Sequence, residues 1–177
     1  QMNRQVSVLT SHDPYRNLAT EEHLLDDLSG DEEMLVLYVN RPVVVIGKHQ
    51  NPWIEVNLPE LDRRGISLAR RISGGGTVFH DLGNLNFSFL GPKKDFDRRG
   101  NLSFVCEVLA GFGVAASVSE KFDLYADDRK ISGNAFCYRR SSVLHHGTLL
   151  VDADLAALGG LLAPPELAVK THAVRSR

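Results

Sequence analysis

The sequence predicts an α+β domain built on a mixed or antiparallel sheet flanked by helices. Short apolar, β-branched runs typical of strands follow one another along the chain, and helical patterns are inserted between them at irregular intervals. The regular alternation of strand and helix that produces a doubly wound parallel sheet is not visible. The 177 residues suffice for one sizeable core and are too few for two comfortable domains, so we expect a single domain over residues 1–177.

The first part of the chain is expected to hold two helices and three strands. Asp13-Pro14 is typical of a helix N-cap followed by proline at the first helical position, and Gly30 should end that helix. Two apolar runs are separated by Asn40-Arg41-Pro42, so we interpret them as a hairpin. A second helix should end at Gly65, before a strand with alternating side chains. The expected elements are a helix within 13–30, hairpin strands over 34–38 and 43–46, a helix over 58–64 and a strand over 66–72.

The second part combines alternating and helical patterns. Over residues 84–89 asparagine and serine alternate with leucine and phenylalanine, which is typical of a strand with one face on the core and one polar face. Apolar residues at i, i+3, i+4 and i+7 over 102–109 predict a helix that buries Cys106. Alternation returns over 117–151, with a turn at Asp127-Asp128. A last helix is expected over about 154–162, before Pro164-Pro165.

Composition and charge exclude several classes of protein. The hydrophobic fraction of 43% and charged fraction of 24% are those of an ordinary globular protein. A formal net charge of -2 provides no overall cationic field, so neither nucleic acid nor membrane is an expected partner. Cys106 and Cys137 share no metal-ligand spacing and are too few for a disulfide framework. With no recognisable export or anchoring signal, we predict a cytoplasmic protein.

The stretch from Arg70 to Asn84 is the most informative part of the sequence. Gly74, Gly75 and Gly76 separate two predicted strands, so a ligand could approach the backbone without meeting a Cβ atom, and successive N–H groups could bind an anion. The alternative is a flexible glycine hairpin preceded by solvated arginines. The Walker pattern and the dinucleotide-binding fingerprint both fail to match, so the common nucleotide folds do not explain this stretch.

Two further stretches could take part in chemistry. Alternation places Lys130 and Ser132 on one face of a strand beside Gly133, where the ammonium group could meet a developing negative charge. An ordinary surface lysine is the alternative. The adjacent His145 and His146 would point to opposite sides of a strand, so structural histidines are expected rather than a metal site.

Together with the segment Ile46-Gly47-Lys48-His49-Gln50-Asn51-Pro52-Trp53, these stretches resemble the lipoate-protein ligase A and lipoyltransferase family. The four motifs follow the family's order and spacing and cover nearly the whole chain. The resemblance implies the catalytic fold of the biotin and lipoate protein ligases. It also implies two steps: the carboxylate of lipoate or octanoate attacks the α-phosphorus of ATP and releases pyrophosphate, and a carrier lysine then takes the acyl group from the adenylate. Mg²⁺ is expected with the ATP.

The resemblance also assigns roles to single positions and names partners. The implied carriers are lipoyl-acceptor domains of 2-oxoacid dehydrogenase E2 subunits or the glycine cleavage H protein. Lys130 is implied as the catalytic residue, and Asp123 is a candidate for contact with Mg²⁺. The implied ATP contacts are Arg71, Gly76, Thr77, Val78, Phe79 and Lys130, and the implied contacts to the acid or its adenylate are Arg70, Ser73, Gly74, Gly75, His80, Asn84, Asp123, Ser132, Gly133 and His146.

Several hypotheses stay open at the level of sequence. Two-domain members of this family continue into a C-terminal accessory domain beyond the point where this sequence stops. The chain could therefore be one part of a longer enzyme, an enzyme competent alone, or a transferase supplied with preformed acyl-adenylate, and the accessory domain could be a separate subunit. It could also be a transferase that uses a Cys137 thioester, or a non-catalytic module that binds a lipoyl group or a nucleotide.

Overall fold

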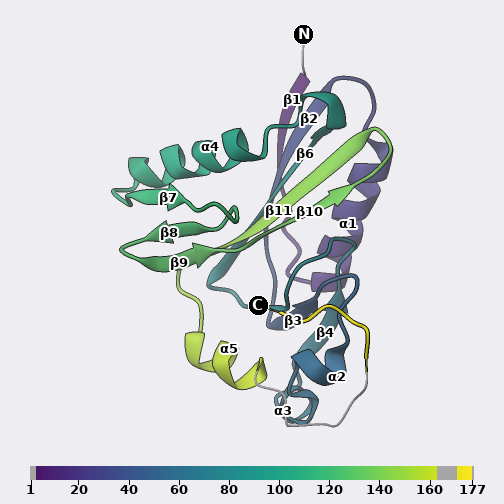
Figure 1. Ribbon diagram of the computed structural model, residues 1–177, viewed down its shortest axis with the longest axis vertical. Helices are drawn as coiled ribbons and strands as arrows, with labels where there is room; N and C mark the ends of the chain where they lie inside the picture. The colour runs from purple at the N-terminus through teal and green to yellow at the C-terminus, as the bar shows by residue number, and fades with distance from the viewer. Residues whose placement is uncertain (1–2, 163–170, 177) are drawn as a thin grey trace.

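The computed structural model describes residues 3–162 and 171–176 and confirms the predicted α+β class (Figure 1). Its largest sheet has five strands, of which the outer pair β1 and β2 is parallel and the other neighbours are antiparallel. The strands, in spatial order, are β1 (Asn3–Val8), β2 (Glu32–Val39), β6 (Asn84–Pro92), β11 (Ser142–Leu150) and β10 (Asn134–Tyr138).

A helix covers each face of this sheet. The predicted first helix is α1 (Pro14–Asp27), and the Asp13 carboxylate caps it by accepting from the N–H groups of the first turn. On the opposite face lies α4 (Arg98–Gly111), which follows the short 3-10 helix η1 (Lys93–Asp95) and carries the predicted stripe with the partly buried Cys106. Figure 1 shows the sheet between the two helices.

Strand β6 shows the predicted alternation, but both of its faces are buried. Phe87 packs with Leu102 of α4. On the other face Asn86 and Ser88 are almost fully covered, and the Ser88 hydroxyl donates to the carboxylate of Glu21 in α1. The polar side of this strand therefore lines the interior between the sheet and α1, where its groups need hydrogen-bond partners.

The predicted hairpin is wrong. Strand β3 (Val43–Ile46) lies in a separate three-stranded sheet, between β4 (Ser67–Arg70) in parallel and β5 (Val78–His80) in antiparallel orientation. The connecting Asn40 is fully buried, accepts from the Asn17 amide at 2.8 Å and lies 3.0 Å from the His80 ring. This anchored residue lets the chain cross from one sheet to the other instead of turning back.

The three-stranded sheet of β4, β3 and β5 packs against three short helices at the lower end of the molecule (Figure 1). The predicted helices near Gly65 and Asp154 are found as α3 and α5, whereas β1 and α2 were not among the expected elements. The strand expected over 66–72 ends at Arg70, because β3 offers only four residues for pairing. Pro164-Pro165 lies outside the described residues. The three helices are α2 (Pro52–Glu55), α3 (Leu58–Arg63) and α5 (Leu155–Leu161).

A third sheet of three strands packs beside α4. Asp127 and Asp128 form the predicted turn, both with positive φ. A bulge then shifts the register, so that Lys130 lies opposite Tyr125 and Ser132 opposite Leu124. Because Tyr125 and Leu124 are consecutive, Lys130 and Ser132 do not share a face, contrary to the expectation. The strands are β7 (Ala116–Val118), β8 (Leu124–Ala126) and β9 (Arg129–Ser132).

No helix within residues 3–162 and 171–176 combines the length and the apolar character needed to cross a membrane.

Candidate functional site

A cavity of about 660 Å³ lies where the three sheets meet. The glycine loop between β4 and β5 forms one wall, and the β8–β9 ribbon and the start of β10 form the other. Strand β11 supplies the floor, and residues near the C-terminus complete the rim. The lining residues are Tyr38, Arg71, Gly75, Gly76, Thr77, Val78, Asn86, Lys121, Asp123, Tyr125, Lys130, Gly133, Asn134, Ala135, His146, Gly147, Thr148, Val174, Arg175 and Ser176.

Arg71 holds the glycine loop in shape. Its guanidinium donates to the carbonyls of Gly74 at 2.7 Å and Gly76 at 2.6 Å, and to the Ser73 hydroxyl at 2.9 Å. Burial lowers the pKa of Arg71 to about 10, so the group stays charged at neutral pH. Gly75, with φ +90, adopts a backbone conformation that side chains disfavour. The loop is therefore a fixed, glycine-specific bend rather than a flexible hairpin.

A buried polar chain supports the loop from behind. The His146 ring lies 2.6 Å from the Ser73 hydroxyl and 3.1 Å from the Glu21 carboxylate, and the Tyr38 hydroxyl donates to Glu21 at 2.9 Å. Burial alone would raise the pKa of Glu21, but His146 and hydrogen bonds from Ser88 and Tyr38 outweigh it and lower that pKa. A buried carboxylate in α1 is thereby coupled to the glycine loop through His146.

Lys130 faces the loop from the opposite wall. Its ammonium group lies 2.9 Å from the Asp123 carboxylate, and half of its side-chain surface remains exposed while Asp123 is largely covered. Gly133 lies beside the lysine, since a Cβ atom there would be in ordinary contact with the Lys130 side chain at 3.6 Å. The Lys130 ammonium, which belongs to the cavity lining, is held there by the Asp123 carboxylate.

Residues near the C-terminus close one side of the cavity. The Ser176 hydroxyl accepts from the Thr77 N–H at 2.9 Å and from the Gln50 amide at 3.0 Å. The Gln50 carbonyl oxygen in turn accepts from the N–H of Gly47 and the hydroxyl of Thr77. The upstream motif at 46–53, the glycine loop and the C-terminal segment are therefore joined through one buried glutamine.

The cavity brings together nine of the predicted site residues. Seven others do not line it: Phe79, for example, packs in the core beside the sheet of β3, β4 and β5, and Arg70 donates to the carbonyls of Gly47, Lys48 and Gln50. The predicted residues in the lining are Arg71, Gly75, Gly76, Thr77, Val78, Asp123, Lys130, Gly133 and His146, and those outside it are Arg70, Ser73, Gly74, Phe79, His80, Asn84 and Ser132.

Other lining residues escaped prediction. Tyr38 and Asn86 belong to strands that looked like ordinary parts of the sheet, and only the polar alternation of β6 hinted at Asn86. Cys137, the candidate thioester nucleophile, is not in the lining; it is buried, and burial raises the pKa of its thiol. A buried thiol with a raised pKa is a poor nucleophile, which disfavours the thioester mechanism.

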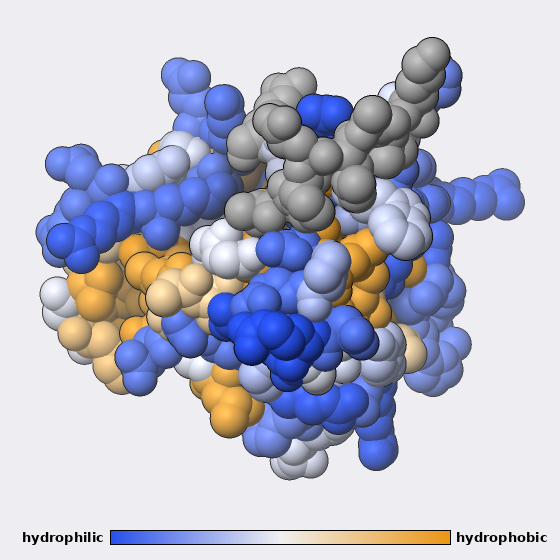
Figure 2. Space-filling view, turned by 90° about the horizontal axis from the view of Figure 1, so that it is seen from below, coloured by the Kyte–Doolittle hydropathy of each residue, from blue (hydrophilic) through white to orange (hydrophobic). Residues whose placement is uncertain are grey.

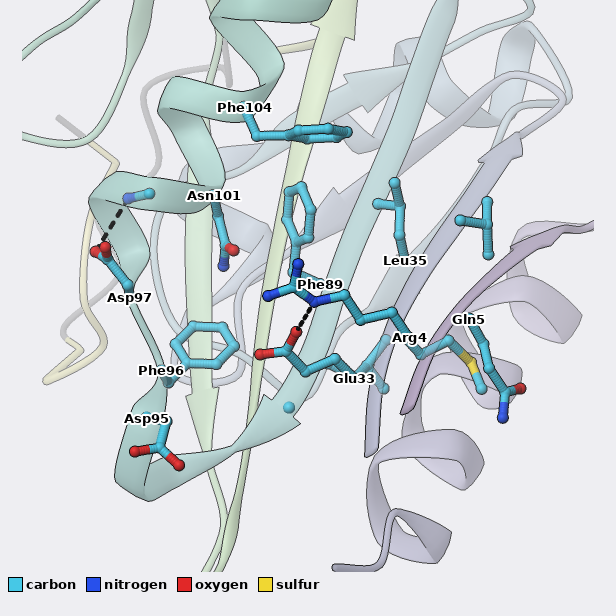
Figure 3. Close-up of a pocket in the computed structure, with 15 residues that line it drawn as sticks. Arg4, Gln5, Glu33, Leu35, Phe89, Asp95, Phe96, Asp97, Asn101 and Phe104 are labelled. Carbon is cyan, nitrogen blue, oxygen red and sulfur yellow. Dashed lines mark hydrogen bonds and ion pairs between the residues drawn. The ribbon is translucent and has the colours of Figure 1, made fainter. Parts of the chain in front are cut away.

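A second cavity, of about 470 Å³, lies between the start of α4 and strands β1, β2 and β6 (Figure 3). Phenylalanine rings line it, and the Arg4 side chain extends across it. Nε of Arg4 donates to the Glu33 carboxylate at 2.8 Å. Asp95 and Asp97 add acidic groups at the edge. This cavity contains none of the predicted site residues, and its arginine is already paired, so it does not suit a phosphate-bearing ligand.

The face seen from below is largely polar (Figure 2). Hydrophilic side chains cover most of it, and hydrophobic side chains gather in separate patches between them. Apolar atoms make up a large part of the surface of any folded protein, so patches of this kind do not by themselves mark a site.

A model of the lipoyl protein ligase A/B catalytic domain matches residues 13–177. The chain belongs to this family. Two curated relatives in the family are lipoate-protein ligases A. That of Psychrobacter cryohalolentis is 44% identical over 163 residues, which is 92% of this chain and 48% of the relative. The lipoate-protein ligase A of Bdellovibrio bacteriovorus is 42% identical over 164 residues, which is 90% of this chain and 48% of the relative. The chain thus spans about half the length of these relatives.

Solved structures of the family confirm the predicted lipoate ligase fold. A bipartite lipoate protein ligase from Thermoplasma acidophilum, studied with its E2 lipoyl domain, has TM-score 0.87 and 33% identity over 94% of this chain and 68% of that chain. A lipoate-protein ligase A bound with ATP has a TM-score of 0.86 and 33% identity, over 93% of this chain and 73% of that chain. P. falciparum LipL1 in complex with lipoate has a TM-score of 0.86 and 31% identity, over 94% of this chain and 54% of that chain.

Proposed function

We propose that the chain is the catalytic domain of a lipoate-protein ligase, which joins lipoate or octanoate to ATP as an acyl-adenylate and passes the acyl group to a carrier lysine. The observation that carries the proposal is that the Lys130 ammonium and the glycine loop at Gly75-Gly76-Thr77 face one cavity. Family members with ATP and with lipoate bound support the choice of substrates.

The first step requires two anions to meet. As the carboxylate oxygen bonds to the α-phosphorus, the bond from that phosphorus to pyrophosphate breaks, and negative charge must be neutralised throughout. Lys130 can exchange Asp123 for a substrate oxygen, because it lines the cavity and half of its side-chain surface is exposed. Backbone N–H groups of the loop, which Arg71 keeps in place, can bind phosphate oxygens.

The cavity fits a magnesium ion that arrives with the nucleotide. Mg²⁺ needs few protein ligands when phosphates and water supply the rest, and Asp123 offers one carboxylate in the lining. Within residues 3–162 and 171–176 no cluster of three or more His, Cys, Asp or Glu side chains could hold an ion alone. The ion would supply positive charge at the phosphates, with Asp123 as its protein contact.

The carrier and the setting follow from the same proposal. We infer that lipoyl-acceptor domains of 2-oxoacid dehydrogenase E2 subunits or the glycine cleavage H protein supply the lysine, in the cytoplasm. The T. acidophilum ligase, studied with its E2 lipoyl domain, supports this class of partner. A neutral amine is the attacking species, so the carrier lysine must lose its proton before transfer.

Pyrophosphate exchange tests the ligase proposal. Lys130→Ala should reduce lipoate-dependent exchange of labelled pyrophosphate into ATP by at least about a hundredfold, since it removes a charged group at the reacting phosphate. Lys93→Ala removes an exposed lysine of η1 and should leave exchange unchanged. If the wild-type chain showed neither exchange nor transfer from synthetic lipoyl-adenylate, with or without a relative's accessory domain, the proposal would be wrong.

A second candidate is a transferase part of a split enzyme. It is favoured by the resemblance to the bipartite T. acidophilum ligase, which extends over 94% of this chain. In that case exchange should appear only after an accessory domain is added, while transfer from synthetic lipoyl-adenylate should proceed with this chain alone. Exchange by the chain alone would instead identify a ligase that needs no second part.

A further inference from the structure

Phe122 has an unusual backbone conformation at the edge of the site. Its φ is 63°, in the left-handed region that bulky side chains rarely occupy. A tight turn surrounds it: the Phe122 N–H donates to the Ser119 carbonyl at 3.1 Å, and the Asp123 N–H donates to the Ser119 hydroxyl at 3.0 Å. A strained residue persists only where its surroundings fix it, so the contacts of Phe122 indicate what the strain achieves.

The side chain of Phe122 is held by a cation and a second ring. The Arg98 guanidinium, at the start of α4, lies 5.6 Å from the Phe122 ring and 5.0 Å from the ring of Phe136 in β10. The two rings pack edge to face, with centroids 5.9 Å apart. Arg98 therefore sits over both aromatic rings and joins three separate segments of the chain.

The carbonyl of Phe122 is fixed from the other side by Asn134. The Asn134 amide donates to this carbonyl at 2.7 Å, and its oxygen lies 3.0 Å from Nε2 of His145. Burial lowers the pKa of His145 to about 3, so its ring is neutral, and Nδ1 lies 3.4 Å from the Asn101 amide. Nδ1 of His145 then accepts from the Asn101 amide, so the ring proton is on Nε2. Nε2–H donates to the Asn134 side-chain oxygen, and this leaves the Asn134 NH₂ group facing the Phe122 carbonyl.

The consequence falls on the next residue. Asp123 leaves the left-handed turn with its carboxylate 2.9 Å from the Lys130 ammonium, and it is the carboxylate partner that the structure gives Lys130. We propose that Phe122 is a positioning residue, whose left-handed backbone, locked by Arg98, Phe136 and Asn134, holds Asp123 against Lys130. Its effect on catalysis rests on the ligase function proposed above, whereas its effect on the turn does not.

Amide hydrogen exchange tests the turn without any assay of activity. Arg98→Ala and Phe122→Leu should each speed exchange of the Phe122 and Asp123 amides at least about tenfold, while amides in the middle of α4 keep their protection. The matched controls are Arg140→Ala and Phe112→Leu, which change an exposed arginine and an exposed phenylalanine outside the turn. Unchanged protection in both Arg98→Ala and Phe122→Leu would overturn the proposal.

A double-mutant cycle tests whether Phe122 affects catalysis by positioning Asp123 beside Lys130. In pyrophosphate exchange, Phe122→Leu should lower kcat about tenfold and change the KM for ATP by less than about twofold. In an Asp123→Asn background the same substitution should cause no further loss, because Phe122 acts through Asp123. Additive losses would show that Phe122 acts elsewhere and would overturn the proposal. If the wild-type chain showed neither exchange nor transfer, with or without an accessory domain, the proposed function would fail, and the amide measurement would still decide the role of Phe122.

Discussion

The planar guanidinium of Arg71 supports the glycine loop through contacts that a lysine could not reproduce. It is buried and donates to the Val45, Gly74 and Gly76 carbonyls and to Ser73. Arg71→Lys keeps the charge but leaves buried carbonyls without donors, so we expect a loss of about 2–4 kcal/mol in the free energy of unfolding and a higher KM for ATP. Urea unfolding measures the free energy of unfolding, and the kinetics of pyrophosphate exchange measure the KM for ATP.

The matched control for Arg71→Lys is Arg140→Lys, at an exposed position. It should change the free energy of unfolding by less than about 0.5 kcal/mol. An unchanged KM for ATP in Arg71→Lys would mean that the loop keeps its shape without the guanidinium, and the role given to Arg71 would be wrong.

At the same scale, sequence predicts some site residues and misses others for physical reasons. The glycine loop and Lys130 stand in contiguous motifs, so the resemblance could assign them. Tyr38 reaches the cavity from a strand whose alternation indicates only which face is apolar. Glu21 looks like one more acid on a helix, and only the packing of α1 on the sheet reveals that it is fully covered and bonded to His146.

At the scale of elements, the packing of side chains from β6 and β10 over strand β11 depends on Gly147. A Cβ atom at this position would overlap the Phe87 ring of β6 and the Asn134 amide of β10. Gly147→Ala should therefore displace the Phe87 ring and the Asn134 side chain, and lower the free energy of unfolding by about 1–3 kcal/mol. The control Gly159→Ala, in α5 with open space around it, should raise stability by up to about 1 kcal/mol. Equal unfolding midpoints for the two variants would contradict this packing.

The elements also show where local patterns stop being informative. The side chains of the residues directly before helices α1, α3 and α5 cap them, and such caps are visible in the sequence. These residues are Asp13, Asn57 and Asp154. Strand pairing is not visible in this way. β2 and β3 are close in sequence yet pair in different sheets, because the buried contacts of Asn40 with Asn17 and His80 come from distant segments.

At the scale of the whole molecule, buried histidines make stability depend on pH. Burial lowers the pKa of His80 and of His145 to about 3, while the unfolded chain binds these protons below about pH 6.5. The stabilisation from the neutral rings is therefore complete above pH 6.5 and falls as the pH drops towards 3. Glu21, with its lowered pKa, adds a loss below about pH 4.5 in the same direction. Urea unfolding at pH 7 and pH 5 should differ by up to about 2 kcal/mol per histidine.

Replacing one of these histidines separates burial from general acid sensitivity. His145→Gln should lower the free energy of unfolding at pH 7, because the ring packs against Phe136 at 4.5 Å between centroids. Between pH 7 and pH 5, however, this variant should lose less stability than the wild type, since one site that takes up a proton only on unfolding has gone. His23→Gln, with a side chain 71% exposed, should keep the wild-type difference. If His145→Gln also kept it, the imidazole would take up its proton in the folded state as well. Nδ1 would then be a donor, and the Asn101 amide could no longer donate to it.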